Sequence, residues 1–252
     1  MFNPMDMSGR TILVTGASSG IGQETSILLS RLGARLMLVA RNADRLAQTL
    51  SQLDGAGHVA RPFDLNQVDA IPDWVRTITG EVGPLDGVVH CAGLHMLRPI
   101  RFLNSGDMIR IMRINLDAAF GLVKGLRQKG CRRSEASVVL MASVMGVVGQ
   151  PGVAAYAASK GAVIAFTKSA ALELAPEHIR VNCIVAGYLK TPMSDALKSA
   201  LTEEQFATIE RMHPLGIGSP SDVANAAAFL LADTGRWITG TGMVVDGGYT
   251  AH

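Results

Sequence analysis

The feature that most constrains this chain is a glycine-rich turn set between an apolar run and a helical segment. Thr11–Val14 is a short run of β-branched and apolar residues, which predicts a strand. After it, apolar side chains recur at helical spacing over residues 21–32, and Arg35–Ala40 is again almost continuously apolar. Runs of that kind are typical of strands buried on both faces of a parallel sheet. The first forty residues therefore predict a strand–helix–strand unit.

The same alternation continues to the end of the chain. Further strands are expected at Val59–Phe63, Leu85–Cys91, Ser137–Ala142, Ile179–Val185 and Gly242–Val245, and further helices near Val68–Thr79, Asp107–Leu126 and Tyr156–Leu174. Crossovers of a dozen residues or more require parallel strands covered by helices. No linker, repeat or low-complexity tract divides the sequence. We therefore expect an α/β fold, in which residues 1–252 form a single doubly wound, Rossmann-type domain with a seven-stranded parallel sheet and helices on both faces.

The composition excludes several classes of partner. Lysine and arginine number 23 against 21 acidic residues, and this net charge of +2 lacks the basic excess that nucleic-acid binding requires. No apolar run approaches the ~20 residues of a membrane-spanning helix, so we expect no membrane partner. Three scattered cysteines and an N-terminus without a signal-peptide pattern indicate a reducing compartment, and we expect a cytoplasmic protein. The six histidines form no metal-binding spacing, so we expect no metal.

Two short motifs carry groups suited to chemistry. Residues 15–22 read TGASSGIG, and such a turn between strand and helix directs backbone N–H groups and the positive end of the helix at a pyrophosphate. A tight turn without a ligand is the alternative. Tyr156 and Lys160 are four residues apart on an expected helix and share one face, where the ammonium is expected to lower the pKa of the phenol. An ordinary amphipathic helix is the alternative there.

Ser143 and Asn115 add two polar residues at informative places. Ser143 follows an expected strand, at the edge where open α/β sheets bind ligands. Asn115 interrupts an apolar helical stretch, where a fully hydrogen-bonded buried amide is the alternative. In this order and spacing the chain resembles the short-chain dehydrogenase/reductase family over roughly residues 9–250, through TGxxxGxG, Asp64-Leu65, Cys91-Ala92-Gly93, Asn115, Ser143, YxxxK, Arg180–Asn182, Ala186-Gly187 with Thr191, and Val245–Tyr249.

The resemblance implies hydride transfer between a nicotinamide cofactor and a carbonyl or alcohol carbon. It implies that Tyr156 is the general acid/base and that Lys160 lowers its pKa and holds the nicotinamide ribose. It also implies that Ser143 orients the substrate oxygen and that Asn115 supports a proton-relay water. The cofactor-binding residues expected here are Gly16, Ser18, Ser19, Gly20, Ile21, Gly22, Arg41, Asp64, Leu65, Ala92, Gly93, Tyr156, Lys160, Gly187, Leu189 and Thr191.

Two residues depart from the family's pattern. Cys91 and Ala186 stand where the family usually has Asn and Pro, which puts local rigidity and cofactor affinity in doubt.

The residue after the second strand decides which cofactor is expected. An acid there would bind the ribose 2′-hydroxyl of NAD. Here Ala40 is followed by Arg41, whose guanidinium can pair with the 2′-phosphate of NADP. We therefore expect NADP, with NAD as the alternative.

The expected substrate is a small carbonyl or alcohol compound. The expected lining, Leu94–Leu97, Val144–Gln150 and Tyr188–Leu197, is mostly apolar, which suits an acyl chain, a steroid or terpenoid ketone, or the apolar face of a sugar. A general likeness to 3-oxoacyl-carrier-protein reductases favours an NADP(H)-dependent reductase of a 3-oxoacyl-type or other apolar ketone. The alternatives are an NAD-dependent alcohol, sugar or hydroxysteroid dehydrogenase, and a non-catalytic cofactor-binding scaffold.

Partners are expected at two surfaces. A basic cluster could contact an acidic carrier protein, and it comprises Lys124, Arg127, Lys129, Arg132 and Arg133. The negative charges of Glu173 and Glu177 would oppose the binding of such a carrier. A solvated basic helix end is the alternative. The family generally pairs its two long helices across a two-fold axis, so we expect a homotetramer. The capping-box pattern at Thr202 predicts a helix that is either a lid over the site or an ordinary surface helix.

Overall fold

A parallel sheet forms the centre of the computed structural model, which describes residues 3–198 and 201–251. Its strands are β1 (Thr11–Thr15), β2 (Arg35–Ala40), β3 (Val59–Pro62), β4 (Leu85–His90), β5 (Arg132–Met141), β6 (Ile179–Ala186) and β7 (Gly242–Val245). They lie in the order β3-β2-β1-β4-β5-β6-β7, and each neighbouring pair is parallel. This arrangement confirms the predicted fold class.

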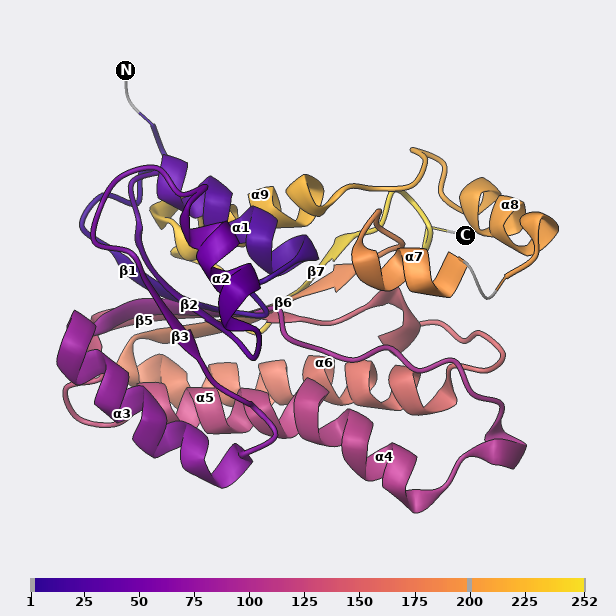
Figure 1. The fold of residues 1–252 in the computed structure, drawn as a ribbon, viewed down its shortest axis with the longest axis horizontal. Helices are drawn as coiled ribbons and strands as arrows, with labels where there is room; N and C mark the ends of the chain where they lie inside the picture. The colour runs from indigo at the N-terminus through magenta and orange to yellow at the C-terminus, as the bar shows by residue number, and fades with distance from the viewer. Residues whose placement is uncertain (1–2, 199–200, 252) are drawn as a thin grey trace.

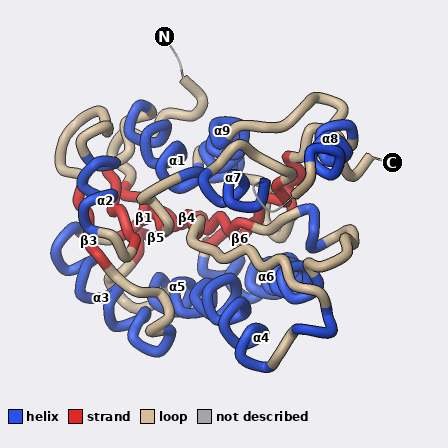
Figure 2. Tube along the Cα trace, turned by 45° about the vertical axis from the view of Figure 1, so that its right-hand side comes forward, coloured by secondary structure: helices blue, strands red, loops and turns tan. Residues whose placement is uncertain are grey.

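Helices cover both faces of the sheet (Figures 1 and 2). One face carries α1 (Gly20–Arg31), α2 (Ala43–Leu50) and α9 (Pro220–Leu231), and the other carries α3 (Ile71–Val82), α4 (Ser105–Met112), α5 (Ala118–Leu126) and α6 (Ala154–Leu174). Two shorter helices, α7 (Pro192–Lys198) and α8 (Glu203–Arg211), follow β6. The apolar side chains of each helical layer pack on the sheet as a separate core cluster. Within the described residues, no helix combines the length and the apolarity that crossing a membrane demands.

The winding of the sheet reverses between β1 and β4. β2 and β3 lie on one side of β1, and the later strands lie on the other. Open α/β sheets bind ligands at the carboxyl ends of the strands beside such a reversal. Thr15 pairs with His90 there, so the glycine turn after β1 meets the segment after β4.

Close packing at this reversal explains two of the glycines. Gly16 has a φ of 66°, and a Cβ on it would lie 2.7 Å from the backbone nitrogen of Ala92. A Cβ on Gly22 would overlap the carbonyl oxygen of Gly16. A side chain at either position would therefore force the turn apart.

The structure corrects two predicted boundaries. The helix expected over Asp107–Leu126 is interrupted, because a π-helical turn at Arg113–Asp117 separates α4 from α5. π-helical turns inside helices occur frequently at functional sites. β5 begins at Arg132 rather than Ser137. The first residues of the strand are polar, and before a register shift they pair with β4 only where Arg132 lies beside Leu85. No apolar run therefore marks this half of the strand in the sequence.

Candidate active site

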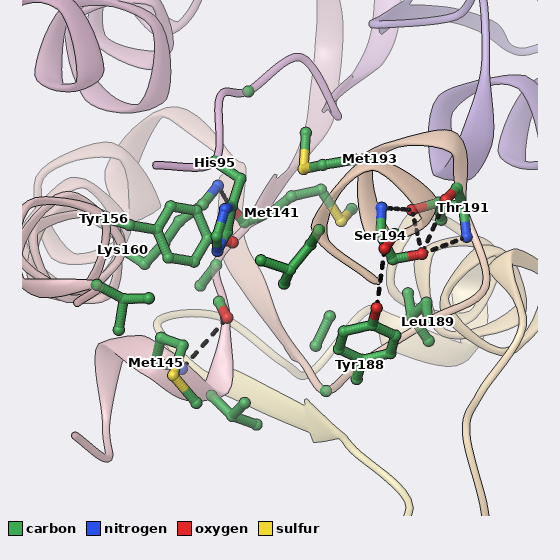
Figure 3. Close-up of a pocket in the computed structure, with 18 of the residues that line it drawn as sticks. His95, Met141, Met145, Tyr156, Lys160, Tyr188, Leu189, Thr191, Met193 and Ser194 are labelled. Atoms are coloured by element: carbon green, nitrogen blue, oxygen red, sulfur yellow. Dashed lines mark hydrogen bonds between the residues drawn. The ribbon is translucent and has the colours of Figure 1, made fainter. Parts of the chain in front are cut away.

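A cavity of about 180 Å³ lies beyond the carboxyl ends of β4, β5 and β6 (Figure 3). Its walls come from the segments that follow these strands, from the start of α6 and from the α7–α8 region. The lining is mostly apolar, and it includes residues from each of the three stretches expected to contact substrate. The cavity brings together these predicted site residues: Ile21, Gly93, Ser143, Tyr156, Lys160, Gly187, Leu189 and Thr191.

Tyr156 and Lys160 lie on one face of α6, as their spacing predicts. The Nζ of Lys160 lies 5.8 Å from the centroid of the Tyr156 ring and donates a 2.7 Å hydrogen bond to the carbonyl oxygen of Met141, at the end of β5. Lys160 is buried, and burial lowers its pKa to about 8. This hydrogen bond fixes the ammonium against the sheet.

The expected lowering of the Tyr156 pKa is wrong. Burial raises the pKa of the phenol, and the side chain of Ser143 only partly opposes that rise. The reason is geometric, because the ammonium of Lys160 is directed at the carbonyl of Met141 rather than at the phenol oxygen. Tyr156 therefore keeps its proton at neutral pH.

Ser143 directly follows β5 and begins a short 3₁₀ turn. Its Oγ accepts a 3.2 Å hydrogen bond from the backbone N–H of Met145. This contact uses an acceptor site of the hydroxyl and leaves its proton available to donate toward the cavity that Ser143 lines.

Asn115 lies in the π-helical turn, behind the cavity wall. Its Oδ1 accepts from the backbone N–H of Leu94 at 2.8 Å, and its Nδ2 donates to the Leu94 carbonyl at 3.0 Å and to the Ser159 hydroxyl at 2.9 Å. The amide therefore fastens the segment after β4 to α6. The alternative of a fully hydrogen-bonded buried amide describes this geometry well, so the relay role of Asn115 stays a proposal.

A buried histidine that sequence reasoning missed connects this turn to the glycine loop. Thr15 donates to the Nδ1 of His90 at 2.8 Å, and the Nε2 of His90 lies 3.3 Å from the carbonyl oxygen of Ile114, to which it donates. Burial lowers the pKa of His90 to about 4, and the charge of Lys160 acts in the same direction. His90 is the last residue of an apolar strand, so no local pattern marks it.

The N-terminus of α1 can accept an anionic group. Its N-cap residue, Ser19, makes no side-chain hydrogen bond to the helix, and the first turn holds no acidic residue. By contrast, Asn42 caps α2 and Thr202 caps α8. Uncapped N–H groups at a helix start bind phosphate. The predicted loop residues Ser18, Ser19 and Gly20 therefore fit a dinucleotide phosphate.

The other predicted cofactor residues lie along the same edge of the sheet. Arg41 is exposed directly after β2. Asp64 and Leu65 follow β3, where Asp64 accepts two hydrogen bonds from Asn66 and Leu65 is buried. Ala92 follows β4 and donates its N–H to the Thr15 hydroxyl at 3.2 Å. These positions form a continuous edge on which an extended dinucleotide could lie.

The two departures from the family's pattern sit inside this framework. Cys91 lines the cavity, and burial raises the pKa of its thiol to about 12, so the thiol stays uncharged. Ala186 is the buried last residue of β6. No group of histidine, cysteine and acidic side chains in the described chain could hold a metal ion.

Helices α7 and α8 form one wall of the cavity, to which α8 contributes Ile209. The Tyr188 hydroxyl donates to the Ser194 carbonyl at 2.9 Å (Figure 3). His213, just after α8, donates from Nδ1 to the Ile209 carbonyl and accepts the Tyr188 N–H at Nε2. α8 is thus part of the site rather than a separate surface helix. Sequence reasoning missed His213 because a lone histidine carries no pattern.

The predicted basic cluster lies at the opposite edge of the sheet. Arg132 and Arg133 begin β5, whereas Ser143 follows its other end, so the two places lie at opposite ends of the strand. The arginines are also paired, Arg132 and Arg127 with Glu177 and Arg133 with Asp86. Within this chain the cluster is therefore remote from the cavity, and its three arginines are each paired with an acid.

Comparison with known proteins agrees with this architecture. A family model described as enoyl-(acyl carrier protein) reductase matches residues 16–250. The chain is 32% identical to the 3-oxoacyl-[acyl-carrier-protein] reductase FabG of Thermotoga maritima, over 97% of this chain and 99% of the relative.

Solved structures show the same likeness. One from Sinorhizobium meliloti, described as a short-chain alcohol dehydrogenase, has a TM-score of 0.92 at 32% identity and covers 99% of both chains. Another, described as a 2-deoxy-D-gluconate 3-dehydrogenase of Agrobacterium tumefaciens with bound NADP, has a TM-score of 0.90 at 31% identity and covers 100% of both chains. This chain therefore belongs to the short-chain dehydrogenase/reductase family and is an oxidoreductase that acts on alcohol and carbonyl groups with NAD(P).

Proposed function

We propose that this protein is an NADP(H)-dependent reductase of apolar ketones. The observation that carries the proposal is the meeting of Ser143, Tyr156 and Lys160 in one mostly apolar cavity. Apolar walls suit a substrate with a hydrocarbon chain, and the few polar groups of the cavity can orient its carbonyl. A non-catalytic scaffold would not require this combination of hydroxyl, phenol and ammonium.

Each of the polar side chains has a separate role in the proposed reduction. When bound, the nicotinamide cofactor supplies the hydride to the carbonyl carbon. The Ser143 hydroxyl donates a hydrogen bond to the carbonyl oxygen, and the Tyr156 hydroxyl gives that oxygen its proton. Because burial raises the pKa of Tyr156, the protonated form that reduction needs is the one present at neutral pH. Lys160 would hold the nicotinamide ribose, and Asn115, whose two amide N–H groups are already donated to Leu94 and Ser159, would support a water that returns a proton to Tyr156.

The preference for NADP is supported by Arg41. It is exposed directly after β2, with Ala40 before it and no acid to oppose a 2′-phosphate. A guanidinium–phosphate pair is a charge-assisted contact worth about 1.5–3 kcal/mol, or roughly 10- to 100-fold in affinity. The structural relative with bound NADP supports the same choice.

The cofactor proposal is tested by steady-state kinetics with NADPH and NADH. We expect a higher kcat/KM with NADPH, and we expect Arg41→Asp to reverse the preference, since it removes the pair and adds a repulsive carboxylate. Arg45→Asp is the matched control, because Arg45 is exposed on α2 one turn further along. A wild-type preference for NADH, or an equal effect of Arg45→Asp, would show that Arg41 does not select the cofactor.

A free ketone is favoured over a carrier-linked one. The basic cluster that would contact an acidic carrier lies at the far edge of the sheet, with its arginines paired to Glu177 and Asp86. A 3-oxoacyl-type substrate remains within the proposal, because the apolar walls accept an acyl chain. We also propose that the protein works as a homotetramer.

A further inference from the structure

His95 stands in the cavity wall directly beside the proposed proton donor. Its imidazole centroid lies 4.6 Å from that of the Tyr156 ring, with the two planes tilted by 52° (Figure 3). The preceding residue, Leu94, is held at both its N–H and its carbonyl by the Asn115 amide. The backbone of the segment that carries His95 is thus anchored to the π-helical turn, next to Tyr156.

The imidazole is uncharged at neutral pH. Burial lowers the pKa of His95, and the nearby charge of Lys160 lowers it further. A neutral imidazole offers one N–H donor and one nitrogen acceptor. It can therefore bind a hydroxyl or carbonyl oxygen without the penalty of a buried charge.

Most of the other polar groups in this wall are already hydrogen-bonded. Lys160 donates to the Met141 carbonyl, the Tyr188 hydroxyl donates to Ser194, and both nitrogens of His213 are engaged. His95 differs from them, because across residues 3–198 and 201–251 neither of its ring nitrogens has a hydrogen-bond partner. Gln150 and Tyr249 also line the cavity without a side-chain hydrogen bond among these residues, but His95 is the one of the three whose ring packs against Tyr156. Its hydrogen-bonding capacity is therefore directed at what enters the cavity.

We propose that His95 is a specificity-determining residue that hydrogen-bonds a second oxygen of the substrate, carried close to the reacting carbonyl. Ser143 and Tyr156 are occupied by the reacting oxygen, Lys160 is directed at the Met141 carbonyl, and the His95 ring packs against that of Tyr156. This inference rests on the proposed ketone reduction and narrows its substrate class to ketones with a neighbouring hydroxyl or carbonyl oxygen. A site that hydrogen-bonds a substrate group selects against analogues that lack it.

Two matched ketones test this role. Ethyl 3-oxohexanoate and nonan-4-one have the same chain length and the same position of the reacting ketone, and only the first carries ester oxygens. We expect wild-type kcat/KM to favour the 3-oxo ester. His95→Phe keeps a ring beside Tyr156 but removes both nitrogens, so the ratio of the two kcat/KM values should fall about 3- to 10-fold, mainly through KM. His95→Gln keeps a donor and an acceptor and should restore part of the ratio.

The outcomes separate this role from a structural one. Thermal unfolding verifies that both variants fold. An unchanged ratio in His95→Phe, or an equal fall in His95→Gln, overturns the inference. If wild-type protein reduces neither ketone, the proposed function fails, and His95 is then tested by ligand-observed NMR with the protein–NADP⁺ complex. Tighter binding of the 3-oxo ester that is lost in His95→Phe supports the inference, and equal binding of both ketones overturns it.

Discussion

At the scale of single residues, Tyr156 and Lys160 have separable roles. Tyr156→Phe keeps the ring beside His95 but removes the proton donor, so we expect kcat to fall by about 10²–10⁴-fold with the fold and cofactor binding retained. Lys160→Met should lower kcat and cofactor affinity together, because it removes the charge proposed to hold the ribose. Steady-state kinetics and NADPH fluorescence titration measure the two effects.

A structural effect accompanies the lysine variant. Lys160 donates to the Met141 carbonyl, and a buried carbonyl without its partner costs about 1–3 kcal/mol. Lys160→Met also removes a buried ammonium, and the lowered pKa of Lys160 shows that burial opposes its charged form. Because these two effects oppose each other, we expect a small change in the free energy of unfolding for Lys160→Met, and none for Tyr156→Phe. If Tyr156→Phe turns over ketone at the wild-type rate, another group supplies the proton, and the division of labour proposed here is wrong.

At the scale of elements, His90 joins β1, β4 and the π-helical turn through Thr15 and Ile114. Its pKa is lowered from 6.5 to about 4, so between these values the unfolded chain binds a proton that the native protein does not. Unfolding is therefore favoured as pH falls, by up to about 3 kcal/mol from this group. Urea unfolding of wild type and of His90→Asn between pH 7 and pH 4 tests this. The variant should have a lower free energy of unfolding than wild type at pH 7, and that free energy should fall less than the wild-type value as the pH is lowered. Parallel pH dependences would contradict this.

The elements themselves were largely predictable. Strands buried on both faces are nearly continuous in apolar residues, so β1, β2, β4 and β6 were visible in the sequence. The break between α4 and α5 was not. The π-helical turn at this break contains Asn115, which hydrogen-bonds to Leu94 and Ser159, 21 and 44 residues away in the chain. Local periodicity carries no information about such distant partners.

The positions of the motif residues in the site were predictable from the sequence, but their electrostatics and their tertiary contacts were not. Motif residues that follow strands could be placed at the carboxyl edge from chain order alone, and Tyr156 and Lys160 from helical spacing. The pKa of Tyr156 depends on where the Lys160 ammonium points, which is decided by the Met141 carbonyl on another element. His95 and His213 belong to the site through tertiary contacts alone.

At the scale of the whole molecule, the α4–α6 face is more apolar than a monomer needs. Ile109, Phe120 and Leu172 are each half exposed or more, and Phe120 packs on Phe166 of α6 with ring centroids 4.0 Å apart. Exposed large apolar side chains on neighbouring helices are typical of a protein–protein contact. This agrees with the pairing of long helices that the family resemblance implies and supports the proposed homotetramer.

Light scattering coupled to size-exclusion chromatography tests that assembly. We expect wild-type protein to elute with four times the 26.6 kDa mass of one chain. Phe120→Asp places a carboxylate in the centre of the expected contact, where an unpaired charge cannot be buried, and should shift the protein to smaller species. Since Phe120 is half exposed within the chain, the variant should still fold, as its circular dichroism spectrum would show. A wild-type protein of 26.6 kDa at micromolar concentration would mean that the apolar face serves another partner.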